Sequence, residues 1–251
     1  MRTFLLLIAG AALATAGPAQ VASTVGPPVA PVGCPISIAI SNDSPAQVGT
    51  GICPYLVEDT AGRPVYVPIC PAILRLVEPG ETFSTLWPQV DNNGRPVPPG
   101  DYAVTVTLPG GAIQQHTVTI DATARGGVAT VGVVRLGTAR RLYACSPRTP
   151  NDLYVMAASA SGTAPGVALC GGTLPLNLDP LLLASLQPNP VLLDFQGLLD
   201  GSGTTTDPAI ALPPIAALAG VSFHVAFVAA PRGQPCPLTV FSEPLRITVN
   251  L

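Results

Sequence analysis

The sequence contains no lysine, two histidines and one tryptophan, and charged residues make up only 10% of its 251 residues. Long amphipathic helices need many charged side chains on their solvent-facing side, and this chain has few. Its 11 arginines against 14 acidic residues give a net charge of −3, which excludes the basic excess of a nucleic-acid-binding protein. With 48% hydrophobic residues, the chain is also too apolar to be disordered.

Residues that break regular structure are abundant instead, with 30 prolines and 25 glycines. Between them lie short segments in which apolar residues alternate with small or polar ones, such as the isoleucines at 36, 38 and 40, or residues 102–108. This period of two is typical of strands with one buried face, and pairs such as Asn93 and Gly94 predict the turns between them. We predict an all-β fold: two immunoglobulin-like β-sandwich domains in tandem after a signal peptide.

The N-terminus has the three parts of a secretory signal peptide. Met1 and Arg2 form a short positive segment, residues 4–13 are apolar, and Ala14 and Ala16 supply the small residues of a cleavage site. The apolar run is shorter than the roughly 20 residues that span a bilayer. We therefore expect a protein that does not span a membrane and is secreted, or is retained in the periplasm or cell envelope.

Changes in composition and period divide the chain into five predicted parts. They are a signal peptide (1–16), a flexible Pro- and Ala-rich lead-in (17–33), a first β-sandwich domain (34–121), a linker (122–127) and a second β-sandwich domain (128–251). In the second domain we expect an extended segment over 128–136. We also expect one short helix after Asp179 and Pro180, because Asp is a preferred N-cap and Pro suits the first helical position.

Six cysteines fit an oxidising compartment, in which cysteines form disulfides rather than metal or catalytic sites. Cys53 and Cys70 flank two predicted strands joined by a tight turn, so we expect a disulfide between them. Cys34 is the other cysteine of the first domain. The remaining three lie in the second: Cys145, Cys170 and Cys236. Either Cys34 forms an inter-domain disulfide with one of these three, or Cys34 and one second-domain cysteine stay free.

The first domain carries a series of spaced motifs. A D-x-x-G segment at 59–62 is followed by a P-G-E turn with Gly80, by Trp87 in an aromatic-rich strand, and by a V-P-P-G-x-Y hairpin with Gly100 and Tyr102. On these motifs the domain resembles the intracellular proteinase inhibitor (BsuPI) family. The resemblance implies an immunoglobulin-like sandwich filled by the Trp and Tyr side chains. It also implies serine-protease inhibition as an activity.

The second domain carries five longer segments that can be compared with other proteins. They are RLGT at 135–138, LYVMAASASGT at 153–163, LPLNLDPLL at 174–182, GLLDGSGTTT at 197–206 and LPPIAALAGVSFHVAFV at 212–228. On these segments the domain resembles a β-rich domain, often repeated, of exported bacterial proteins that has no known function. The resemblance implies export and a β-rich fold, and no activity.

The sequence shows no catalytic or metal-binding motif. There is no G-x-S-x-G, and His116 and His224 fall in different predicted domains, so a nucleophile with an adjacent base is not indicated. For His116 we expect a half-buried, hydrogen-bonded imidazole. The acidic turns at 91–94 and 200–203 resemble the start of a calcium loop, but both lack the Gly and Glu spacing of an EF-hand. We interpret both as hairpin turns.

The leading hypothesis is an exported binding or structural module of the cell envelope or extracellular space, with no catalytic activity, metal or cofactor. The sequence does not identify a partner. We expect a protein or another cell-surface component rather than nucleic acid, since Arg140 and Arg141 form the only adjacent basic pair. The alternative is a serine-protease inhibitor that acts through the first domain. A third hypothesis is a hydrolase without a recognisable motif.

Overall fold

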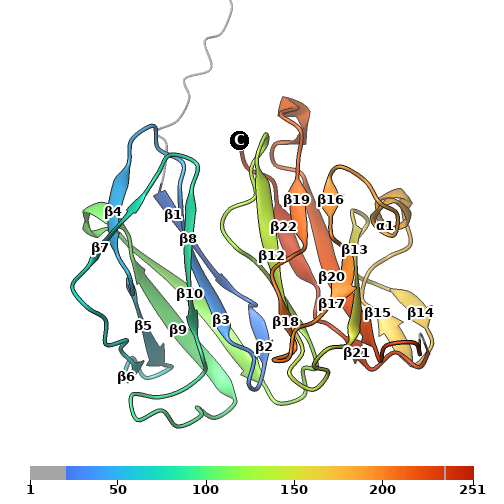
Figure 1. Ribbon diagram of the computed structural model, residues 1–251, viewed down its shortest axis with the longest axis horizontal. Helices are drawn as coiled ribbons and strands as arrows, with labels where there is room; N and C mark the ends of the chain where they lie inside the picture. The colour runs from blue at the N-terminus through green and yellow to red at the C-terminus, as the bar shows by residue number, and fades with distance from the viewer. Residues whose placement is uncertain (1–20, 235) are drawn as a thin grey trace, which may run out of the picture.

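The structure is a computed structural model that describes residues 21–234 and 236–251 (Figure 1). The predicted signal peptide, residues 1–16, lies outside this part of the chain. Strands make up nearly all of the regular structure, and the described residues contain one α-helix, α1 (Pro180–Ser185). The chain is therefore an all-β protein, as the alternating pattern predicts.

The first half of the chain forms a sandwich of two sheets. Its strands are β1 (Val21–Gly26), β2 (Val29–Pro31), β3 (Ile36–Asn42), β4 (Val48–Gly51), β5 (Tyr55–Asp59), β6 (Pro64–Tyr66), β7 (Leu74–Val77), β8 (Thr82–Trp87), β9 (Gly100–Thr107) and β10 (Ile113–Asp121). One sheet has the order β1-β3-β8 and the other β2-β10-β9-β5-β6, while β4 and β7 form a separate ribbon. The three isoleucines of β3 pack in the core with Trp87 and Tyr102, whose rings contact edge to face.

Glycines and aromatic side chains fix the ends of these strands. Gly80 and Gly94 lie in turns with φ of 78° and 75°, and β9 begins at Gly100. The buried side chains of Trp87 and Tyr102 both donate to backbone carbonyls, at 3.0 and 2.7 Å. Their polar atoms are therefore paired inside the sandwich.

The second half forms another sandwich, whose two main sheets both have five strands. Its strands are β11 (Gly127–Thr130), β12 (Ala139–Cys145), β13 (Leu153–Ser159), β14 (Val167–Leu169), β15 (Gly172–Leu174), β16 (Leu192–Leu193), β17 (Gln196–Leu198), β18 (Thr204–Thr205), β19 (Ala209–Ala211), β20 (Ser222–Ala230), β21 (Val240–Phe241) and β22 (Leu245–Thr248). One sheet has the order β11-β12-β19-β16, with β18 also paired to β12. The other has the order β17-β13-β20-β21, with β22 also paired to β20.

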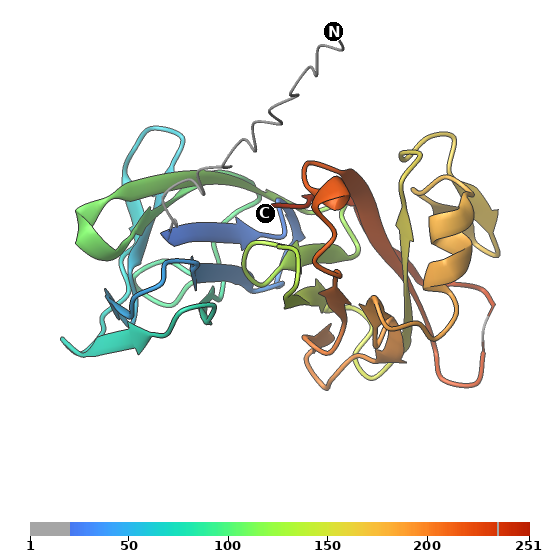
Figure 2. The ribbon, with the colours of Figure 1, turned by 90° about the horizontal axis from the view of Figure 1, so that it is seen from above.

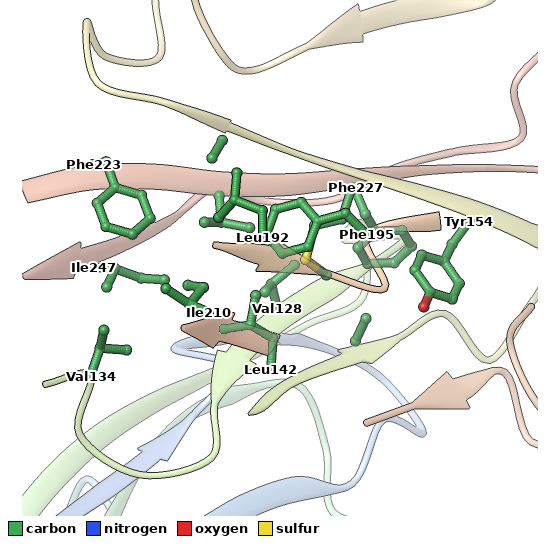
Figure 3. Packing of buried hydrophobic residues seen from close by; sticks show 14 of the residues in the cluster. Val128, Val134, Leu142, Tyr154, Leu192, Phe195, Ile210, Phe223, Phe227 and Ile247 are labelled. Atoms are coloured by element: carbon green, nitrogen blue, oxygen red, sulfur yellow. The ribbon is translucent and has the colours of Figure 1, made fainter. Parts of the chain in front are cut away.

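Strand β20 is buried on both faces. Phe223, Val225 and Phe227 point into the core between the two main sheets (Figure 3). Ala226 and Val228 on the opposite face pack in a second cluster with residues of β15 and α1. The predicted N-cap of α1 is confirmed. The Asp179 carboxylate accepts a hydrogen bond from a backbone N–H of α1 at 2.8 Å.

The predicted flexible lead-in, residues 17–33, is wrong where the structure describes it. Residues 21–26 form β1, which pairs with β3, and residues 29–31 form β2, which pairs with β10 in the other sheet. Pro27 and Pro28 lie where the chain passes from one sheet to the other. The prolines and small residues conceal the strand pattern in the sequence. In the structure, the face of β1 that meets the second half carries only small side chains.

The two sandwiches lie side by side along the longest axis of the molecule (Figures 1 and 2). The expected extended segment over 128–136 is wrong beyond Thr130, where β11 ends. Gly132 has a φ of 95°, so the chain turns there, and residues 131–135 run along the junction between the two halves.

Candidate binding sites at the junction and on the first sandwich

Three disulfides bond all six cysteines of the chain. The pairs are Cys34–Cys145, Cys53–Cys70 and Cys170–Cys236. The first joins the two halves, with its Cα atoms 5.9 Å apart and both cysteines fully buried. Of the two alternatives for Cys34, the structure contains the inter-domain disulfide. The structure also contains the disulfide between Cys53 and Cys70.

Asp43 of the first half forms a second link across the junction. Its carboxylate oxygens lie 2.7 Å from Nε of Arg135 and 3.7 Å from Nη2 of Arg140. Arg140 also donates to the carbonyls of Gly80 and Val133, at 3.2 and 3.1 Å. The Asp43 and Arg140 side chains are only 10% and 9% exposed, so salt screens this charge cluster weakly.

Small residues allow the two halves to approach closely. A Cβ atom on Gly132 would lie 2.6 Å from the Ser41 hydroxyl and 2.9 Å from the Thr82 side chain. The Gly132 N–H donates to the Thr24 hydroxyl at 3.1 Å, and the Val133 N–H donates to the Ser41 hydroxyl at 3.3 Å. The bond, the charge cluster and this close contact together fix the relative position of the two sandwiches.

Beyond this contact the halves leave a cleft of about 510 Å³. Its walls are the outer face of β3 and β8 on one side, and β12 with the β17–β18 turn on the other. Seven of the eleven lining residues carry a hydroxyl group: Ser37, Ser84, Thr85, Tyr143, Thr204, Thr205 and Thr206. The other four are Leu86, Val131, Arg141 and Asp200. The volume of the cleft lies within the range of small-molecule sites in proteins.

Tyr143 is the most unusual residue of this cleft. The residue is 3% exposed, and its hydroxyl group has no hydrogen-bond partner. Burial and the nearby Asp200 carboxylate both raise the pKa of the phenol. A buried unpaired hydroxyl costs free energy, and because this oxygen is itself buried, a molecule in the cleft does not reach it.

Asp200 itself is occupied by its own turn. Its carboxylate accepts hydrogen bonds from the backbone N–H and hydroxyl groups of Ser202 and Thr204, at 2.6–2.9 Å. Burial raises the pKa of Asp200, but these hydrogen bonds outweigh it and the pKa is lowered. This turn and the 91–94 turn, where Asp91 accepts from two backbone N–H groups, are both tight turns. Val90 and Pro96 pair across the 91–94 turn. The predicted hairpin at 200–203 is wrong, because β17 and β18 on either side of it pair with strands of different sheets.

A second hollow, of about 320 Å³, adjoins Arg141. Its lining is Arg141, Tyr154, Asp194, Gln196, Gly197 and Asp207. Arg141 therefore borders both hollows, and its guanidinium makes no ion pair with the described residues. Asp194 has a φ of 51°, a conformation that is uncommon for residues other than glycine and often occurs at functional sites.

A separate feature of the first half is an exposed apolar segment, residues 67–76, which runs into β7 and is called the apolar loop. Val67, Ile69, Ile73, Leu74 and Leu76 are all exposed, and Ile69 is completely so. No side chain of residues 67–74 carries a charge. A monomeric protein rarely exposes so many large apolar side chains together unless they contact a partner.

The apolar loop is held at its first residue and at Cys70. The Val67 N–H donates to the Asn92 side chain at 2.8 Å, and Cys70 is bonded to Cys53. Pro68 and Pro71 fix their own φ and disfavour helical conformations of the residues before them. The loop therefore presents Ile69 in a restrained conformation on a rigid support.

The two histidines do not form a catalytic arrangement. The Ser23 hydroxyl lies 2.8 Å from Nε2 of His116 and donates its proton to Gln114 Oε1 at 2.7 Å. It must therefore accept from the imidazole, the reverse of a nucleophile activated by a base. Burial lowers the pKa of His116. His224 is half-buried in β20, opposite Ser159 of β13.

Over 21–234 and 236–251, no group of three or more His, Cys, Asp or Glu side chains is arranged to hold a metal ion. Within the same ranges, no helix has the length and apolar character needed to cross a membrane.

No protein-family model and no curated protein matches the sequence. Among solved structures, the chain is similar to Escherichia coli alpha-2-macroglobulin in its native conformation (TM-score 0.30, 14% identity, 92% of this chain and 16% of that chain). It is also similar to red sea bream transglutaminase (0.28, 11%, 93% and 31%) and to a tetra-tandem repeat of a large adhesion protein (0.28, 13%, 91% and 50%). The chain thus spans at most half of these proteins, and similarities this low carry no argument about function.

Proposed function

We propose that the chain is a non-catalytic, extracellular or cell-envelope binding module that engages a protein partner through the apolar loop, residues 67–76. The observation that carries this proposal is the complete exposure of Ile69 in a loop held by the Cys53–Cys70 bond. A restrained loop loses little conformational entropy on binding, so its apolar side chains contribute more of their burial to affinity. Three disulfides favour an oxidising compartment.

Site-specific photo-crosslinking tests the proposal in the envelope fraction of the native host. A photoreactive residue replaces Ile69, and the matched control replaces Ile113, which is also exposed and lies on β10 of the same sandwich. We expect one discrete crosslinked protein from position 69 and none from position 113. Equal crosslinking from both positions, or none from either, would contradict a docking role for the loop.

The same loop favours a second candidate, the serine-protease inhibitor implied by the BsuPI resemblance of residues 34–121. An inhibitory loop must enter a protease active site and resist opening, which Pro68, the bonded Cys70 and the exposed Ile69 support. A titration of the oxidised protein against a subtilisin-type protease distinguishes this candidate. Inhibition with an equivalence point near one to one, lost in Ile69→Asp and kept in Ile113→Asp, would identify an inhibitor. Full protease activity at excess protein would exclude it for this protease class.

A further inference from the structure

The cleft between the two sandwiches and the hollow beyond Arg141 have no role in the proposed docking through the loop. The two hollows meet at Arg141, which lines both, and are together called the groove. We infer that this groove is a second binding site, for a neutral oligosaccharide or a segment of a neutral polysaccharide. The inference is independent of the loop, which lies on other strands of the first sandwich.

The donors and acceptors of the groove match a polyhydroxylated ligand. A sugar hydroxyl both donates and accepts hydrogen bonds, so it needs partners of both kinds. The Arg141 guanidinium only donates, the Asp194 and Asp207 carboxylates accept, and serine and threonine hydroxyls do both. The hydroxyl groups of Ser84 and Thr206 line the cleft and make no hydrogen bonds to the rest of the described chain, so they can pair with such a ligand.

The charge of the groove excludes strongly charged ligands. One arginine faces three carboxylates in the lining described above, and recognition of phosphate or nucleic acid requires several basic side chains. An acidic ligand would also approach Asp194 and Asp207. A neutral ligand with many hydroxyl groups avoids both penalties.

The shape of the groove suits a chain of several sugar rings. The two hollows measure about 510 and 320 Å³ and share a single arginine, which favours an elongated ligand over a compact one. Leu86 and Val131 provide apolar surface for the C–H groups of a ring.

Tyr143 supplies a control from the wall of the cleft, because its hydroxyl is buried without a partner and lies out of reach of a bound molecule. Removing that hydroxyl should leave the melting temperature unchanged or raise it. The same change should leave ligand binding unchanged.

The experiment is calorimetric titration of the oxidised, full-length mature protein with cellotetraose, maltotetraose and chitotetraose, and with tetra-alanine as the peptide probe. We expect at least one tetrasaccharide to bind with a Kd below about 5 mM. Arg141→Ala and Ser84→Trp should weaken that binding about tenfold, since each removes a hydrogen-bonding group and the Trp also fills the cleft. Tyr143→Phe and Ile69→Asp should both leave it unchanged.

Arg95→Ala and Thr117→Trp are the matched controls, because both residues are exposed on the first sandwich away from the groove. The inference is overturned if no tetrasaccharide binds, if binding survives Arg141→Ala and Ser84→Trp, or if only tetra-alanine binds. Because Ile69→Asp tests the loop alone, failure of the groove inference leaves the docking proposal unaffected, and the reverse also holds.

Discussion

The Cys34–Cys145 bond should make a larger contribution to stability than either cysteine's packing would suggest. It closes a loop between residues 111 positions apart, and in the chain-entropy model a loop of this length restricts the unfolded chain by about 4.7 kcal/mol. The Cys53–Cys70 bond lies inside that loop and shortens it only slightly. That inner bond joins residues 17 apart, so its own contribution is about 3 kcal/mol.

The test replaces each pair with alanine, because serine would place an unpaired hydroxyl in a buried site. Equilibrium urea unfolding under oxidising conditions should show a free energy of unfolding lower by about 4.7 kcal/mol for Cys34→Ala with Cys145→Ala. For Cys53→Ala with Cys70→Ala the loss should be about 3 kcal/mol. Non-reducing peptide mapping of the unmodified protein should recover both linkages. A reversed ranking, or a free thiol at position 34, would refute the reasoning.

Two further predictions concern buried and hydrogen-bonded carboxylates. Asp43→Asn leaves two largely buried guanidinium groups without their partner. Urea unfolding should therefore show a free energy of unfolding lower by about 3 kcal/mol, whereas the exposed control Glu243→Gln should lose almost nothing. Equal losses would contradict the ion-pair assignment. Burial raises the pKa of Asp179, but hydrogen bonds from α1 and from residues 159–161 outweigh this effect and lower the pKa. The carboxylate therefore stabilises the folded state above its unfolded pKa near 4. This contribution is lost as the pH falls toward the pKa of the folded state. Asp179→Ala should therefore lose about 1 kcal/mol at pH 7 and show a weaker decline in stability between pH 4 and pH 2, and a decline as steep as that of the unmodified protein would exclude this role.

The core-facing residues of the alternating strands are the part of the fold that the sequence predicts well. In β3, the isoleucines at 36, 38 and 40 alternate with Ser37, Ala39 and Ser41, and the isoleucines do enter the core. The pattern says nothing of the other face, however. That face is also buried, because it is the surface on which Gly132 and its neighbours pack. A small or polar residue that is covered by a distant part of the chain looks the same in sequence as one that faces solvent.

The candidate sites illustrate the same distinction. The apolar loop leaves a local signal, an uncharged run with prolines on both sides of Cys70, which could have been noticed in the sequence. The groove leaves none. Ser84 and Arg141 lie 57 positions apart and become neighbours only through the position of one sandwich on the other. Their serine, threonine and arginine side chains are ordinary surface residues in any local reading.

Two of the three disulfides lie beside the surfaces proposed for binding. Three of the six sheets in the described residues have only two or three strands, and many strands have only two to four residues, so local pairing supplies little of the rigidity that recognition requires. One disulfide restrains the apolar loop at Cys70, and another fixes the two walls of the groove beside Tyr143, which packs directly against Cys34 and Cys145. A hydrophobic core alone would keep each sandwich folded. It would not hold residues from two sandwiches in one groove, and the inter-domain bond and the Asp43 ion pairs are the features of the structure that do so.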